Sequence, residues 1–214
     1  MNYILATATN SEYYLETQQM LYSINKLLPN GVKVIICDNG LTESQKNILL
    51  QRFGFCNIEI FKHNLTQYEK ESYYFKAIVL QRALEKANDN TILLWLDAKT
   101  MLKYNENQLL NILRQSPVYG HTNYPQPENL WTDKRTMDYF SLSDEDRNSF
   151  QVQSPAMLFD LRQKLGKEFV LEFIECLNKK DVLTPNGSNK GFQPPTHRQD
   201  QSVFSCLMKK KNLF

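Results

Sequence analysis

Apolar and polar positions alternate in a strand–helix–strand order along the first half of the chain. Short apolar runs that are typical of β-strands cover residues 3–9, 32–38, 58–63 and 91–97. Segments with an apolar position every three to four residues lie between these runs and predict helices, at residues 11–28, 41–53 and 73–87. The last apolar run, TILLWLD, is apolar on both faces, as expected of a strand covered by helices on both sides of a sheet.

The pattern becomes less regular in the second half. Residues 121–150 are polar and loop-rich, and residues 184–199 form a long stretch rich in Pro, Gly and Asn. Further strands are expected at residues 118–121 and 150–161, and further helices at 106–115, 162–180 and 200–210. The second half therefore predicts mixed strands and helices that pack against the first half and form one wall of a cleft.

Strands and helices that alternate at this spacing imply right-handed crossovers. They predict an α/β fold with a mostly parallel central sheet, helices on both faces and a smaller mixed region. The length of 214 residues suits a single domain.

Composition and charge narrow the class of protein. The net charge of +2 comes from mixed acids and bases, without the clustered basic footprint of nucleic-acid binding, so no nucleic-acid partner is expected. The four cysteines are widely spaced and predict free thiols in a reducing compartment, hence a cytoplasmic location. No apolar run reaches the length of a membrane span.

Small or polar residues follow the predicted parallel strands at the point where each strand ends. In open parallel sheets, ligands bind beyond the carboxyl ends of the strands, so these residues are expected to meet at one rim. They are Thr7, Ala8 and Thr9 after the first strand, Asp38 after the second, Lys62 and His63 after the third, and Asp97, Ala98 and Lys99 after the fourth. Hydroxyls and acids suit a base and ribose, and cations suit phosphates, so the rim predicts a nucleotide site.

Fingerprints of other nucleotide and metal sites are missing. The chain has no G-x-G-x-x-G after its first strand and no G-x-x-x-x-G-K-[ST], so dinucleotide-binding and P-loop sites are not expected. No H-E-x-x-H motif or paired Cys/His cluster indicates a zinc site.

Five stretches, taken in order, resemble the GT-A family of glycosyltransferases: CDNG, FKAIVLQRAL, LWLDAKT, QVQSPAMLFD and HRQDQSVFS. The likeness covers nearly the whole chain, and within the family it is nearest to a transferase domain of chloroviruses, large DNA viruses, that glycosylates the major capsid protein. The resemblance implies a single GT-A domain. Residues 1–104 would form the nucleotide-sugar-binding half and residues 105–214 the acceptor-side half.

Members of the family usually end the apolar strand with an acid-x-acid motif, whose acids hold Mn²⁺ or Mg²⁺ against the nucleotide diphosphate. Here the motif is Asp97-Ala98-Lys99, so a lysine stands in the place of the second acid. Two interpretations follow. In the first, Asp97 and His197 bind a metal ion that is weakly held or dispensable. In the second, Asp97 binds the sugar or ribose while the Lys99 ammonium binds the phosphates.

Three further donor-site candidates come from other elements. Asp38 is expected to contact the base or ribose, or else to form the turn that DNG favours. The resemblance implies that Lys76 approaches the donor sugar or phosphates, with a solvated helix face as the alternative. Gln153 is placed to hydrogen-bond a sugar, beside Pro155, which indicates a strand edge or bulge.

The loop before the last helix carries the remaining candidates. Arg198 is expected to hold the diphosphate. Two roles are open for Asp200, which is either the base that deprotonates the acceptor hydroxyl or the N-cap of the helix. A base at Asp200 favours inversion at the anomeric carbon.

The predicted function is transfer of a sugar from a UDP-sugar, such as UDP-glucose or a UDP-rhamnose-like donor, to a hydroxyl of a glycan or glycoprotein. Two alternatives remain at this point. One is a sugar nucleotidyltransferase, although ATATNSEYY lacks the Gly/Arg/Lys-rich loop of such enzymes. The other is a non-catalytic module that binds nucleotide or glycan.

Overall fold

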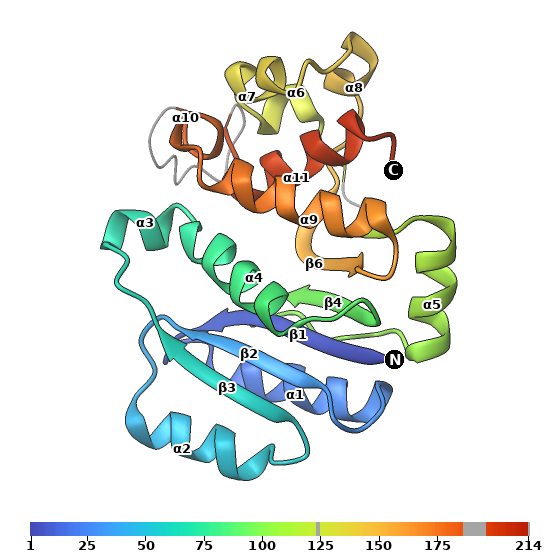
Figure 1. Cartoon of the computed structure of the whole chain (residues 1–214). Coiled ribbons are helices and arrows are strands. Elements are labelled where there is room, and N and C mark those ends of the chain that lie inside the picture. Colours follow the sequence, from blue (N-terminus) through green and yellow to red (C-terminus); the bar gives the residue numbers. More distant parts are fainter. Residues whose placement is uncertain (123–124, 186–195, 214) are drawn as a thin grey trace.

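A six-stranded sheet forms the centre of the computed structural model, which describes residues 1–122, 125–185 and 196–213 (Figure 1). The strands are β1 (Asn2–Thr9), β2 (Lys33–Asp38), β3 (Asn57–Lys62), β4 (Thr91–Leu96), β5 (Val118–His121) and β6 (Gln153–Asp160). Their order in the sheet is β3-β2-β1-β4-β6-β5. Strands β1 to β4 are parallel and β6 runs antiparallel to both β4 and β5, which confirms the mostly parallel sheet.

Helices cover both faces of the sheet, because alternate residues of the buried strands point to opposite sides (Figure 1). One face packs against α1 (Tyr14–Leu27), α2 (Glu43–Arg52) and α5 (Glu106–Gln115), and the other against α4 (Tyr74–Lys86), α9 (Lys164–Leu177) and α11 (Gln199–Lys210). Every residue of β4 is buried, as its doubly apolar sequence predicts. In the described part of the chain, none of the helices has the length and apolarity that crossing a bilayer requires.

Five short helices in the described part of the chain were not predicted from the sequence, and three of them lie in the region expected to be loop-rich. They are α3 (Gln67–Glu71), α6 (Glu128–Trp131), α7 (Lys134–Tyr139), α8 (Asp144–Asn148) and α10 (Lys180–Leu183). The expectation of a loop-rich region at 121–150 was therefore incomplete. A helix of one or two turns is too short to show a 3.6-residue period, so its sequence looks like that of a loop. Most of the predicted 184–199 loop lies outside the described residues.

Strand β6 resolves the two alternatives for Pro155. The strand lies between β4 and β5, so Pro155 is not at an edge of the sheet. The register between β5 and β6 shifts between Gly120 and His121, where His121 pairs with Gln153. The irregularity that proline indicated is therefore a bulge next to it. The carbonyl of Pro155 still accepts a hydrogen bond from the backbone N–H of Asp97, at 2.8 Å.

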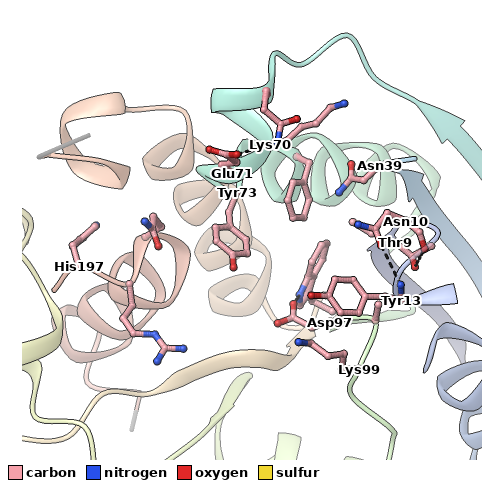
Figure 2. Close-up of a pocket in the computed structure, with 17 residues that line it drawn as sticks. Thr9, Asn10, Tyr13, Asn39, Lys70, Glu71, Tyr73, Asp97, Lys99 and His197 are labelled. Atoms are coloured by element: carbon pink, nitrogen blue, oxygen red, sulfur yellow. Dashed lines mark hydrogen bonds between the residues drawn. The ribbon is translucent and has the colours of Figure 1, made fainter. Parts of the chain in front are cut away.

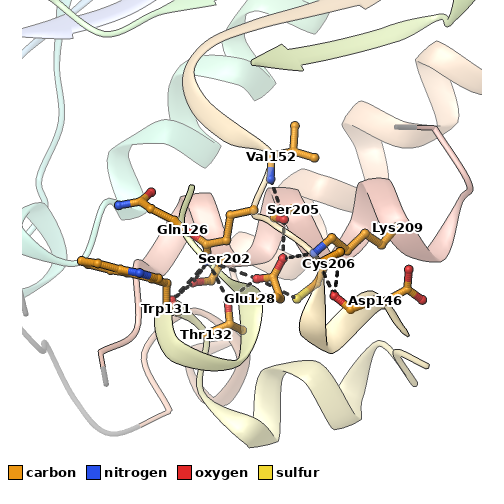
Figure 3. A network of polar contacts seen from close by, with 12 residues as sticks. Gln126, Glu128, Trp131, Thr132, Asp146, Val152, Ser202, Ser205, Cys206 and Lys209 are labelled. Atoms are coloured by element: carbon orange, nitrogen blue, oxygen red, sulfur yellow. Dashed lines mark hydrogen bonds and ion pairs between the residues drawn. The ribbon is translucent and has the colours of Figure 1, made fainter. Parts of the chain in front are cut away.

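A buried polar network fixes α11 against the segment before β6 (Figure 3). Glu128 and Lys209 are both fully buried, and Lys209 Nζ lies 2.6 Å from Glu128 Oε2. The same oxygen accepts a hydrogen bond from Ser205 Oγ at 2.5 Å, and Gln151 Nε2 donates to Glu128 Oε1 at 3.1 Å. These contacts satisfy both charges away from water and hold α11, which Arg198 precedes and whose first turn carries Asp200.

Candidate functional site

A cavity of about 510 Å³ lies at the carboxyl ends of β1, β2 and β4, between the first turns of α4 and α11 (Figure 2). Helix α3 forms part of its rim. Seven of the residues predicted from sequence line it: Ala8, Thr9, Asp97, Ala98, Lys99, His197 and Arg198. Seven others do not: Thr7, Asp38, Lys62, His63, Lys76, Gln153 and Asp200. Strand ends and helix starts that are distant in sequence thus contribute to one site.

Two threonines of β1 serve the structure of the strand ends. Thr7 is fully buried and donates a hydrogen bond from its hydroxyl to the backbone oxygen of Leu96, at 2.6 Å. The hydroxyl of Thr9 lies 2.7 Å from that of Thr17 on α1. Thr7 therefore joins the ends of β1 and β4, and Thr9 joins the cavity wall to α1.

Asp38 makes the contacts of a turn-forming residue. Its Oδ1 accepts hydrogen bonds from the backbone N–H groups of Gly40 at 2.9 Å and Leu41 at 2.6 Å. Burial by itself raises the pKa of this carboxyl, but these bonds and the nearby Lys46 ammonium outweigh burial and lower the pKa. The neighbouring Asn39 lines the cavity instead. The turn that Asp38 forms thus directs the amide of Asn39, rather than its own carboxylate, towards the site.

Lys76 is the cation that faces Asp97. It is 1% exposed, and its Nζ lies 2.5 Å from Asp200 Oδ2 and 3.6 Å from Asp97 Oδ1. Ser154 Oγ donates to the same oxygen of Asp200 at 2.7 Å, and Trp95 Nε1 donates to Asp97 Oδ1 at 2.7 Å. Lys76 therefore holds Asp97 and Asp200 in the cavity wall. It neither lines the cavity, as a direct contact with a donor would require, nor lies on a solvated helix face.

One lysine between two carboxylates leaves a net negative charge in this cluster. Burial raises the pKa of Asp97; Lys76 opposes that rise and the second carboxylate, Asp200, adds to it. Burial lowers the pKa of Lys76, but the two carboxylates outweigh burial and raise it. Lys76 is therefore protonated, and the side chain of Asp97, 38% exposed, presents a carboxyl group to the cavity.

Lys99 and Arg198 use aromatic rings rather than acids as protein partners. Lys99 Nζ lies 4.6 Å from the centre of the Tyr13 ring, and the Arg198 guanidinium lies 5.5 Å from that of Trp131. Figure 2 shows Lys99 and Tyr13 side by side next to Asp97. Among the described residues, neither cation has a carboxylate within ion-pair distance, so both charges remain available to an anionic ligand.

His197 lines the cavity with both ring nitrogens already bonded to the protein. Nδ1 accepts a hydrogen bond from the backbone N–H of Asp133 at 3.1 Å, and Nε2 lies 2.9 Å from the backbone oxygen of Leu183. Burial lowers the pKa of His197 to about 4, so the ring is neutral. Nε2 is therefore the protonated donor, and neither nitrogen presents a free lone pair to a metal ion.

The donors that a divalent cation needs are not grouped at this site. Within the described ranges, no cluster of three or more His, Cys, Asp or Glu side chains is arranged to hold a metal ion. Asp97 is the acid-motif residue in the cavity, and one of its oxygens is already shared by Trp95 and the Lys76 ammonium. This donor set does not fit a tightly held Mn²⁺ or Mg²⁺.

Two cavity residues with unusual backbone geometry escaped sequence reasoning. Tyr73 precedes α4 with φ 64° and Gln199 begins α11 with φ 33°, both in the left-handed region that non-glycine residues rarely adopt. Both line the cavity, and Tyr73 projects into it (Figure 2). Strain of this kind concentrates at functional sites. Sequence patterns carry no signal for φ at a tyrosine, so only the tertiary structure reveals it.

Solved structures with a similar architecture include glycosyltransferases. The bifunctional glycosyltransferase WbbM matches with TM-score 0.60 and 11% identity over 97% of this chain. The galactosyltransferase LgtC, in complex with donor and acceptor sugar analogues, matches with TM-score 0.58 and 14% identity over 97%. TarS of S. aureus, in complex with UDP, matches with TM-score 0.52 and 14% identity over 86%.

The chain spans 37% of WbbM, 70% of LgtC and 53% of TarS. Neither a comparison with protein-family models nor a search of curated protein sequences finds a match. The strand order, the antiparallel strand β6 and these structural matches define the fold as that of the GT-A glycosyltransferases, as the sequence predicted.

Proposed function

We propose that this chain is a glycosyltransferase that moves a sugar from a UDP-sugar donor to a hydroxyl of a glycan. The observation that carries the proposal is the cavity, where the exits of β1, β2 and β4 converge with the start of α11. Open parallel sheets bind nucleotides at this place. The presence of UDP in TarS and of donor and acceptor analogues in LgtC supports the same use of the fold.

The lining matches the parts of a nucleotide sugar. Asn10 and Asn39 offer amide N–H donors near the ends of β1 and β2, where a base and ribose would lie. Their Oδ1 atoms already contact the Tyr13 N–H and His63 Nε2. Lys99 and Arg198 offer positive charge for a diphosphate. Positive charge there stabilises the diphosphate as the bond from the sugar's anomeric carbon to the leaving oxygen breaks and UDP departs with the electron pair.

The donor sugar is proposed as glucose or a rhamnose-like deoxyhexose, and the acceptor as a glycan carried on a glycoprotein, with the viral capsid protein as one candidate. These details rest on the sequence resemblance alone. The preference for inversion rested on Asp200 as a base. Since Asp200 lies 2.5 Å from Lys76 and does not line the cavity, a proton acceptor would have to come from another residue.

A thermal-shift and turnover experiment tests the proposal. UDP and UDP-sugars are expected to bind more tightly than GDP, CDP or UMP and so to raise the melting temperature more. A ligand at about 100 times its Kd stabilises the native state by about 2.7 kcal/mol. UDP release from UDP-glucose or UDP-rhamnose is then measured with and without glycan acceptors.

Asp97→Asn is expected to reduce turnover, whereas the matched control Asp89→Asn changes an acid whose side chain is 93% exposed and far from the site. Tight UDP binding without turnover on any acceptor would instead support a non-catalytic binding module. Equal shifts with all nucleotides would contradict the donor assignment.

A further inference from the structure

The charges of the cavity differ from those of a metal-dependent site. The second acid of the expected acid-x-acid motif is Lys99, and the first, Asp97, has the Lys76 ammonium 3.6 Å from its Oδ1. Trp95 Nε1 and this buried ammonium both already contact Asp97 Oδ1, so this oxygen has little capacity left for a divalent cation. The third expected ligand, His197, has both nitrogens bonded to the backbone of other elements.

Cationic side chains of the cavity can supply the positive charge that a divalent metal ion would bring. Lys99 follows β4 and Arg198 precedes α11, so the two approach the cavity from different walls. Lys70 of α3 lines the rim (Figure 2) and, within the described residues, has no acid at ion-pair distance. Lys99 and Arg198 together carry the two positive charges that Mn²⁺ would supply.

The aromatic partners of these cations suit a ligand-binding role. The rings of Tyr13 and Trp131 orient Lys99 and Arg198 without neutralising them. A carboxylate partner in either place would have to be displaced by the incoming phosphate. The guanidinium of Arg198 can donate two parallel hydrogen bonds to phosphate oxygens, and the ammonium of Lys99 acts as a point charge.

We propose that Lys99 and Arg198 hold the diphosphate of the donor in place of a divalent metal ion, so that the site works without metal. The inference rests on the proposed function, because it assigns the part of the cavity that binds the UDP diphosphate. Lys76 is a positioning residue in this scheme: it fixes Asp97 and Asp200 from behind the wall and touches no ligand.

The test measures UDP and UMP binding by calorimetry, in EDTA and in Mn²⁺, for the wild-type chain and for single variants. Wild type is expected to bind UDP with the same Kd in both buffers. Lys99→Met and Arg198→Met are expected to weaken UDP binding about tenfold or more, because each removes a charge-assisted contact, and to change UMP binding less. Lys103→Met, an exposed lysine outside the cavity, is the matched control and should bind as wild type.

A variant that should make UDP binding depend on Mn²⁺ extends the test. Lys99→Asp restores the acid-x-acid motif, and we expect it to bind UDP only when Mn²⁺ is present. Wild-type binding that requires Mn²⁺, or Lys99→Met and Arg198→Met variants that bind UDP as wild type does, would overturn the inference while leaving the proposed function intact. Absence of UDP binding in both buffers would contradict the proposed function itself, and the inference with it.

Discussion

The ammonium nitrogen of Lys76 lies 2.5 Å from a carboxylate oxygen of Asp200, although 124 positions separate the two residues. The contact joins the first turn of α4 to the first turn of α11, and these turns flank the cavity. Both side chains are buried, so the pair is a fixed part of the wall rather than a mobile surface contact. Asp97, next to the same ammonium, is held in place by the same cluster.

Removing the Lys76 charge is expected to destabilise the fold. Lys76→Met leaves Asp200 and Asp97 without their cation, and an uncompensated buried charge costs about 3–5 kcal/mol. Urea unfolding measures the loss. Lys86→Met is the control on the same helix, since its side chain is 40% exposed, and its cost should stay below about 1 kcal/mol. The double variant Lys76→Met with Asp200→Asn should be more stable than Lys76→Met alone. Equal losses of unfolding free energy in Lys76→Met and Lys86→Met would contradict a buried charge cluster at Lys76.

The stability that His197 contributes is expected to depend on pH. Its folded-state pKa is about 4 and the ordinary value is 6.5, so between these values the unfolded chain binds a proton that the folded chain does not. Stability from this residue is therefore present above about pH 6.5 and is lost as the pH falls towards 4, by up to about 3 kcal/mol.

We compare wild type with His197→Gln by urea unfolding from pH 4.5 to 7.5. The difference in unfolding free energy should shrink as the pH falls, because the other titrating groups are common to both chains. Added Mn²⁺ should leave this difference unchanged. A difference that grows at low pH, or one that Mn²⁺ enlarges, would contradict a neutral ring held by backbone groups.

The Glu128–Lys209 pair provides a second buried charge whose partner can be removed. Lys209→Met is expected to cost about 3–5 kcal/mol, because Glu128 is left charged and fully enclosed. The next residue supplies the control: Lys210 is 43% exposed and pairs with Glu172, so Lys210→Met should cost less than about 1 kcal/mol. The double variant Glu128→Gln with Lys209→Met should be more stable than Lys209→Met alone, as measured by chemical unfolding.

A side chain at Gly120 of β5 is expected to destabilise the fold. A Cβ at this position would overlap the ring of Phe204 and lie 2.7 Å from Val152 Cγ1. Gly120→Ala should therefore lower the unfolding free energy by about 1–3 kcal/mol. Gly54→Ala is the control, since its nearest atom would lie 3.8 Å away, and it should change stability little. Similar melting temperatures for the two variants would contradict the close packing of β5 on α11.

Much of the framework of the site follows from local patterns. The alternation of apolar runs and helical periods predicted the order of the long elements. The capping box of Thr42 and Gln45, two residues three positions apart, marks the start of α2. The rule that ligands bind beyond the carboxyl ends of parallel strands predicted that Thr9, Asp97 and Lys99 lie together, and all three line the cavity. These signals are readable because each depends on residues within a few positions of one another.

The partners of the charged residues were decided by the tertiary structure. Asp97 and Lys99 are two positions apart, yet Asp97 faces Lys76 and Lys99 faces Tyr13. A strand end is irregular, so spacing along the chain does not determine where two side chains point, and the partner arrives on whichever helix packs against the wall. By itself, the sequence determined which strands form the sheet and which rim carries the cavity. The packing of α4 and α11 decided which cations face that rim, because a long-range contact depends on the path of the whole chain between its two residues.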